Sequence, residues 1–230
     1  MNDEVKGDEP LSRNELLAEE ALLAKAVGGW RGMIDSSLPS VVFIVLYVVM
    51  GFNDVWSAER LKYSLIAAVA AGVVIAVIRL LRRESLQQVI AGFVGVAVSA
   101  FVAARTGNAS DYFLPGLLLN VGYFLAFLVS VFVRWPLIGV IVGLLTTQNA
   151  AWRSDRELRR TYAAATWLWV GVFALRLVVQ VPLYLAGLVA PLGVLKILMG
   201  WPLYLAAVYF TYRLISPALK ARRSVPDERL

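Results

Sequence analysis

The sequence predicts an all-α integral membrane protein, a bundle of about six transmembrane helices. Three observations indicate this fold class. The chain of 230 residues is 60% hydrophobic, whereas a soluble domain is usually about 45–50% apolar. Its apolar residues gather in segments of the length that a helix needs to cross about 30 Å of hydrocarbon, which is about 20 residues. Its basic residues are distributed unevenly between the loops on the two expected sides of the membrane.

Six apolar segments follow one another along the chain. The first opens after Ser36 and Ser37, which we expect to cap the helix, with Pro39 in the first turn, where a missing N–H is tolerated. The predicted spans are 38–52, 64–81, 86–104, 114–133, 162–185 and 189–215.

Three regions of the chain differ in composition. Residues 1–35 form an acidic tail that we expect to be cytoplasmic, with either a short amphipathic helix over 14–27 or a frayed acidic segment there. Residues 36–215 form the six-helix membrane domain. Residues 216–230 form a basic cytoplasmic tail.

The distribution of positive charge predicts the orientation. Residues 135–145 are apolar but cover only about half of a spanning length, so we assign them to the membrane interface or a re-entrant turn. With six spans, 17 of the 22 Lys and Arg residues lie on the side of the two termini and three lie on the other side. Positive loops stay in the cytoplasm, so both termini are expected there.

The composition also excludes several chemistries. The sequence has no cysteine and no histidine, which excludes disulfides, thiolate catalysis, His-based metal sites and a Ser-His-Asp triad. It shows neither paired acids that could hold Mg²⁺ nor a phosphate-binding Gly-rich loop. We therefore predict no catalytic residue, no metal and no cofactor. The net charge of +6 is interpreted as membrane topology rather than nucleic-acid binding.

Two ionisable residues lie inside predicted spans, which is costly and indicates a functional site. Counting 1.5 Å per residue places Arg176 and Lys196 each about 10 Å below the outer surface. Asn120, Gln180 and Ser99 come to a similar level on neighbouring helices. Because the charges among these five residues are positive, they predict a pocket for an anionic group such as a lipid phosphate.

A structural role for the same residues is the alternative. Lys196 could extend its amine to the outer interface, and Arg176 could pair with Asp54 or Asp111, the acids expected at the outer face. The cluster would then hold the helices together without binding a ligand.

Three weaker patterns accompany this site. Small residues recur at 68, 72 and 76 and at 92, 95 and 99, a spacing that lets helices pack closely. The sequence Pro-Leu-Tyr-Leu-Ala occurs at both 182–186 and 202–206. A charged cluster is expected at the cytoplasmic ends of the first two spans, as positive-inside charge or as a contact for anionic headgroups: Arg31, Asp35, Arg79, Arg82, Arg83 and Glu84.

Several short motifs between residues 38 and 215 resemble an actinobacterial six-span membrane family of unknown function, which is distantly similar to intracellular septation protein A. These motifs are Leu38-Pro39, the basic run 79–83, Pro136-Leu137-Ile138, Leu158-Arg159-Arg160 with Trp167, and Lys196. The resemblance implies a multi-pass protein of the bacterial cytoplasmic membrane, linked to the cell envelope or septation. It implies action through partners and no established catalysis.

Three functions are therefore considered. The first is a non-enzymatic envelope protein that engages membrane lipids or division proteins. The second is a carrier or channel-like protein that binds an anionic solute or lipid in an outer-leaflet pocket. The third is a lipid-modifying enzyme. A closed, salt-bridged site would favour the first, a water-filled vestibule the second, and a cleft open to lipid would favour lipid binding.

Overall fold

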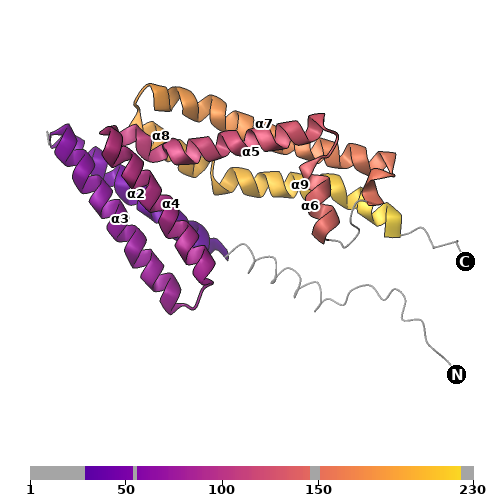
Figure 1. Ribbon diagram of the computed structural model, residues 1–230, viewed down its shortest axis with the longest axis horizontal. Coiled ribbons are helices and arrows are strands. Elements are labelled where there is room, and N and C mark those ends of the chain that lie inside the picture. Colours follow the sequence, from indigo (N-terminus) through magenta and orange to yellow (C-terminus); the bar gives the residue numbers. More distant parts are fainter. Residues whose placement is uncertain (1–28, 54–55, 146–150, 224–230) are drawn as a thin grey trace, which may run out of the picture.

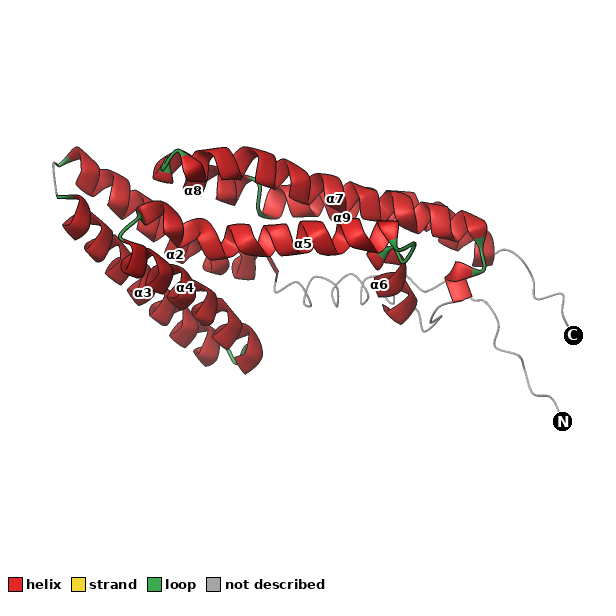
Figure 2. Ribbon diagram, turned by 45° about the horizontal axis from the view of Figure 1, so that its top comes forward, coloured by secondary structure: helices red, strands yellow, loops and turns green. Residues whose placement is uncertain are grey.

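The computed structural model describes residues 29–53, 56–145 and 151–223, and every regular element in these ranges is helical. Figure 2 shows these helices joined by short loops. The all-α fold class is therefore confirmed. The elements are α2 (Gly29–Phe52), α3 (Ser57–Leu81), α4 (Leu86–Thr106), η1 (Ala109–Phe113), α5 (Leu114–Phe132), α6 (Leu137–Leu145), η2 (Ala151–Arg153), α7 (Arg156–Leu185), α8 (Val189–Leu198) and α9 (Trp201–Arg223).

Six helical segments in the described ranges are long and apolar enough to cross a membrane, as the sequence predicted. Between 17% and 28% of the residues in their most apolar windows are buried within the protein, so most of their apolar surface faces outward. An even number of crossings returns the chain to the side on which it began. The spans are Asp35–Phe52, Ser57–Leu81, Leu86–Thr106, Ala109–Phe132, Arg156–Leu185 and Val189–Pro217.

The spans form two arms that diverge from a common end (Figure 1). Helices α2, α3 and α4 pack together in the first arm, and α5, α7 and α9 pack together in the second. The short elements η1 and α8 contact both arms at the closed end of this V.

Two apolar cores stabilise the two ends of the molecule. The first core joins α2, α3 and α4 to η1 and α8 at the closed end, and its aromatic centre is Phe43 stacked on Tyr112 with ring centroids 4.2 Å apart. The second core lies at the far end of the second arm, where Trp152 and Tyr162 pack edge to face. The polar residues of interest lie between these two cores, close to the junction of the arms.

Helix α2 differs from the expected first span. It begins at Gly29, so Ser36 and Ser37 lie inside the helix and do not cap it, and Pro39 is a buried residue of the helix interior. The early start is supported by Asp35 in the second turn, because its carboxylate is bound by α3 arginines. The amphipathic helix expected over 14–27 lies outside the described residues.

The sixth span is broken, whereas the sequence predicted one continuous helix over 189–215. Helix α8 ends at Leu198 and α9 begins at Trp201. Pro202 has no backbone N–H to continue the helical ladder, and the N–H of Gly200 donates to Ile197 O over 3.0 Å in a tight final turn. Helix α9 then runs to Arg223, so it includes the first part of the expected basic tail.

The segment 135–145 does not form a span. Its helix α6 has nine residues, which extend only about 14 Å. It packs on α7, and a Cβ on Gly139 would lie 3.0 Å from atoms of Trp152 and Tyr162. The short length agrees with the expectation that this segment does not cross the membrane.

One of the two small-residue patterns has a different role from the one expected. Gly72 on α3 faces α4, and a Cβ there would lie 3.4 Å from Val96, as helix packing requires. Gly92 and Gly95 on α4 are exposed, and a Cβ on Gly95 would meet no atom within 4 Å. The pattern on α4 therefore leaves a hollow instead of bringing a helix close.

Candidate functional site

A cavity of about 340 Å³, here called the cationic cavity, lies where the two arms meet. Helices α2, α5, α7, α8 and α9 all contribute to its wall. Arg176, Lys196 and Asn120, three of the five residues singled out from the sequence, line it together. The break between α8 and α9 also lines it, through Gly200 and Trp201.

Arg176 lies near the middle of α7 and is 7% exposed. Its guanidinium carbon is 4.9 Å from the centre of the Tyr204 ring, an arrangement in which the ring face attracts the cation. Its Nε atom is buried and has no hydrogen-bond partner within the described ranges. A buried N–H donor without a partner is costly, so a polar ligand or a water at this atom would be stabilising.

Lys196 is held against aromatic rings at the closed end of the V. It lies in the last turn of α8, and its Nζ is 5.0 Å from the centre of the Phe113 ring and 5.8 Å from that of Tyr112. A Cβ on Gly116 would lie 3.9 Å from its Cε, so the lysine packs along the start of α5. In the part of the chain that the structure describes, no carboxylate lies within 4.0 Å of Arg176 or Lys196.

The other sequence-selected residues are distributed around this cavity. Asn120 on α5 is buried and lines it. Gln180 lies one turn beyond Arg176 and is 3% exposed, but it is not on the cavity wall, and its Nε2 has no partner among the described residues. Ser99 lines a neighbouring hollow that also reaches Lys196.

Of the two acids considered as counter-charges, Asp111 forms no ion pair with these cations within the described residues. Asp111 is buried in η1, and its Oδ1 accepts a hydrogen bond of 2.6 Å from the Tyr184 hydroxyl. This bond ties η1 to α7 and orients the carboxylate toward a neutral partner. Asp54 lies outside the described residues.

Sequence reasoning missed the serines of α2 and the aromatic residues of the cavity. Ser36 and Ser37 were interpreted as a helix cap and Ser40 was not singled out, yet all three line the cavity. Tyr204 was visible only as part of the repeated Pro-Leu-Tyr-Leu-Ala sequence. Its counterpart Tyr184 also contacts a charged residue, so the repeat marks two tyrosines that each bind an ionisable side chain.

A second hollow of about 870 Å³, here called the apolar groove, lies between α4 and α5. Five residues line both the groove and the cationic cavity: Ser36, Ser40, Gly116, Leu119 and Lys196. The two spaces therefore adjoin each other, and Lys196 lies on the wall of both.

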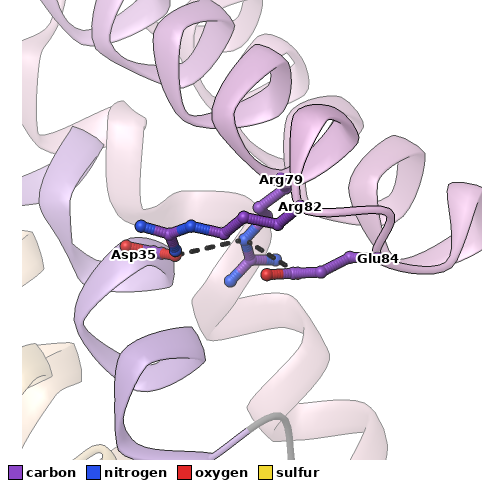
Figure 3. A network of polar contacts seen from close by, with 4 residues as sticks. All are labelled: Asp35, Arg79, Arg82 and Glu84. Carbon is purple, nitrogen blue, oxygen red and sulfur yellow. Dashed lines mark hydrogen bonds and ion pairs between the residues drawn. The ribbon is translucent and has the colours of Figure 1, made fainter.

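A separate group of charges, here called the Asp35 cluster, lies at the open end of the first arm (Figure 3). Arg82 Nη1 donates to Asp35 Oδ2 over 3.1 Å. Arg79 Nε lies 3.7 Å from the same carboxylate oxygen and 3.6 Å from Glu84 Oε2. Asp35, Arg79, Arg82 and Glu84 thus join α2, α3 and the loop after α3. The side chain of Arg31 lies outside the described part of the chain.

Comparison with known proteins places the chain in a family without assigning an activity. The profile of a family described as "Protein of unknown function (DUF3159)" matches residues 27–222, which covers more than half of the chain. No curated protein and no solved structure matches it. The matched range contains all six spans and the cationic cavity. The chain therefore belongs to the DUF3159 family.

Proposed function

We propose that this protein binds an anion in the cationic cavity, with Arg176 and Lys196 as the charged donors. One observation supports the proposal above all others. Two cations from different helices line one cavity, and the described residues offer neither of them a carboxylate within 4.0 Å. The function considered second from the sequence, a carrier or channel-like protein for an anionic solute or lipid, is thus favoured over a scaffold.

Electrostatics explains why an anion fits this space. A buried cation without a partner carries a desolvation penalty of several kcal/mol, on the order given for single ions in proteins. Two neighbouring cations also repel each other. A bound phosphate or carboxylate would offset both terms through charge-assisted hydrogen bonds, and the planar guanidinium of Arg176 can donate two of them to one group.

The helix break adds to this environment. Gly200 and Trp201 begin α9 at the cavity wall, and the first N–H groups of a helix carry partial positive charge. Membrane carriers place the ends of broken helices at their ion sites in the same way. Asn120 supplies a further neutral polar group, while the rings of Tyr204 and Phe113 position the two cations.

The location and orientation of the protein in the cell rest on separate arguments. We propose the bacterial cytoplasmic membrane with both termini inside, on the basis of the charge asymmetry and the family resemblance. The septation link rests on the resemblance alone, and midcell accumulation of a fluorescent fusion in dividing cells would test it.

Anion binding can be measured with inorganic phosphate as the probe. The purified protein in a neutral detergent is heated while tryptophan fluorescence is followed, with sodium phosphate compared with sodium chloride at equal ionic strength. Phosphate should raise the Tm in a saturable way because a ligand that binds only the folded state stabilises it. Arg176→Gln and Lys196→Gln should each raise the half-saturating concentration about 10–100-fold, the loss expected for one charge-assisted hydrogen bond.

Matched variants make the experiment decisive. Arg82→Gln and Lys62→Gln remove cations outside the cavity and should leave the half-saturating concentration within about twofold, because exposed charges act weakly. Asp54→Asn should also leave it unchanged. A tenfold gain in phosphate affinity on Asp54→Asn would instead identify Asp54 as the counter-charge and refute the proposal. If Arg176→Gln does not fold, Lys196→Gln and the charge-preserving Arg176→Lys are used to test the anion site. An unchanged half-saturating phosphate concentration in Lys196→Gln counts against the site.

A further inference from the structure

The apolar groove adjoins the cationic cavity and shares Lys196 with its wall. It is lined mainly by apolar residues of α4 and α5, among them Val94, Val98, Leu118 and Leu119, which are 44–61% exposed. Both helices belong to predicted spans, so these side chains face the hydrocarbon of the membrane. The groove therefore leads from the lipid phase to the amine of Lys196.

Small residues keep the groove free of side chains. Ala91, Gly92 and Gly95 form part of its α4 wall. A Cβ on Gly95 would meet nothing within 4 Å, and one on Gly92 would approach only the end of the Arg79 side chain, at 3.9 Å. Since Gly weakens a helix by about 0.5–1 kcal/mol relative to Ala, two glycines that pack against no neighbouring helix need another reason, and an occupant of the groove is one.

We propose that the anion is the headgroup of a membrane lipid whose acyl chain lies in the apolar groove between α4 and α5. This inference rests on the proposed anion site and specifies its ligand as an anionic lipid, with phosphatidic acid as the simplest representative. A lipid could enter sideways between the two arms. Its chain would remain among apolar groups throughout, while its headgroup would exchange water for Lys196 and Arg176.

The shared wall of the two spaces favours a lipid over a soluble anion. Five residues are shared between the cationic cavity and the apolar groove, so an anion at Lys196 sits at the end of an apolar channel. A ligand pocket typically combines a mostly apolar wall with a few placed polar groups. A soluble anion would use only the polar part of this surface and would leave the larger hollow without an apolar partner.

Photocrosslinking tests the position of the chain. The protein is reconstituted in phosphatidylcholine nanodiscs that contain a minor fraction of phosphatidic acid with a diazirine at the end of one acyl chain. After irradiation, peptide mapping should find label on the groove segments of α4 and α5 several-fold above that on Val178 and Leu185, which are lipid-facing residues of α7. Phosphatidylcholine with the same diazirine should label the groove several-fold less, because it lacks net negative charge.

Two variants test the position of the acyl chain independently of the anion site. Gly95→Phe fills the groove without a backbone clash and should reduce groove labelling several-fold while leaving the response to inorganic phosphate unchanged. Gly122→Phe on α5 is the matched control, because Gly122 is also exposed, a Cβ there would meet no atom within 4 Å, and the residue lies outside the groove. Should Gly95→Phe fail to fold, Ala91→Phe replaces it.

The outcomes distinguish the two proposals. Even labelling of all lipid-facing helices, or unchanged labelling in a folded Gly95→Phe, would overturn the lipid assignment although the phosphate response persists. If phosphate does not raise the Tm of the wild-type protein, both the anion site and the lipid assignment are refuted. Groove labelling that disappears in Arg176→Gln and falls in Gly95→Phe would support both.

Discussion

The Asp35 cluster and the cationic cavity use the same kinds of cation in opposite surroundings. Arg79 and Arg82 lie 3.1–3.7 Å from carboxylate oxygens at the end of the first arm. Arg176 and Lys196 lie 4.9–5.8 Å from the centres of aromatic rings, with no carboxylate within 4.0 Å in the described residues. Among the described residues, the first group contains its own counter-charges, whereas the second group has none within 4.0 Å.

The difference distinguishes charges that set the membrane topology from charges that are available to bind a ligand. Positive charge at a helix end is explained by the positive-inside rule and is balanced here by nearby acids. Positive charge inside a span has no such explanation, and its cost has to be offset by a bound or neighbouring group. We therefore expect variants of the Asp35 cluster to change stability slightly and variants of the cavity to change binding strongly.

The largest expected effect concerns the side of the membrane on which each region lies. The chain has no cysteine, so single cysteines can be introduced at Ser57, Asn108 and Ser154. In sealed cells an impermeant maleimide should label the first two and leave the third unlabelled until the membrane is opened. Asn108 is used instead of Gly107, because the positive φ of 74° at Gly107 disfavours any other residue.

This labelling pattern would place the closed end of the V outside and the Asp35 cluster inside. Labelling of Ser154 in intact cells would reverse the orientation. The Asp35 cluster could then no longer be interpreted as positive-inside charge, and the comparison between the two regions would fail.

Much of the architecture was predictable because hydropathy and helix geometry act over long segments. The six spans and the short 137–145 helix follow from length alone. Counting 1.5 Å per residue brought Arg176, Lys196 and Asn120 to one level, and the structure places these three residues on the wall of one cavity. Gln180 is not on that wall, although it shares a face of α7 with Arg176, because one further turn carries it about 6 Å beyond that level.

The remaining features depend on backbone geometry and on helix direction. Hydropathy cannot detect the break at Gly200, since the residues around it are as apolar as a continuous span. Ser36 is part of a helix that faces the cavity only because α2 begins early, and the contact of α2 with α8 brings Ser36 and Ser40 to its wall. The glycines of α4 satisfy the spacing for helix packing, yet the two arms diverge beside them and leave the apolar groove.

An intermediate effect is expected where α8 contacts α2. A Cβ on Gly193 would overlap the end of the Ile44 side chain, which is buried. Gly193→Ala should therefore lower the free energy of unfolding by about 1–3 kcal/mol through overpacking, measured by thermal unfolding in detergent. Because Lys196 follows one turn later, phosphate binding should also weaken several-fold, while the Asp35 cluster is unaffected.

Two further variants test whether the overlap with Ile44 causes the effects of Gly193→Ala. Adding Ile44→Ala to Gly193→Ala removes the overlapping atoms and should restore most of the phosphate affinity. Gly171→Ala on α7, where a Cβ would meet nothing within 4 Å, should be neutral or slightly stabilising, as Ala is favoured over Gly in a helix. A Gly193→Ala protein with unchanged stability and affinity would show that the junction of the arms does not position Lys196.

The smallest effect is expected from Asp35→Asn. Asp35 is 19% exposed, and its partners Arg82 at 3.1 Å and Arg79 at 3.7 Å are 46% and 12% exposed. Solvent screens the closer of these two pairs, so the free energy of unfolding should fall by about 1 kcal/mol. The loss should shrink further in high salt, and a double-mutant cycle with Arg82→Gln measures the coupling directly. The critical readout is phosphate affinity, because Ser36, the next residue in α2, lines the cationic cavity. An affinity within twofold of the wild type keeps the two regions independent. A tenfold change would mean that the acidic end of α2 acts on the anion site, and the Asp35 cluster would then have to be treated as part of it.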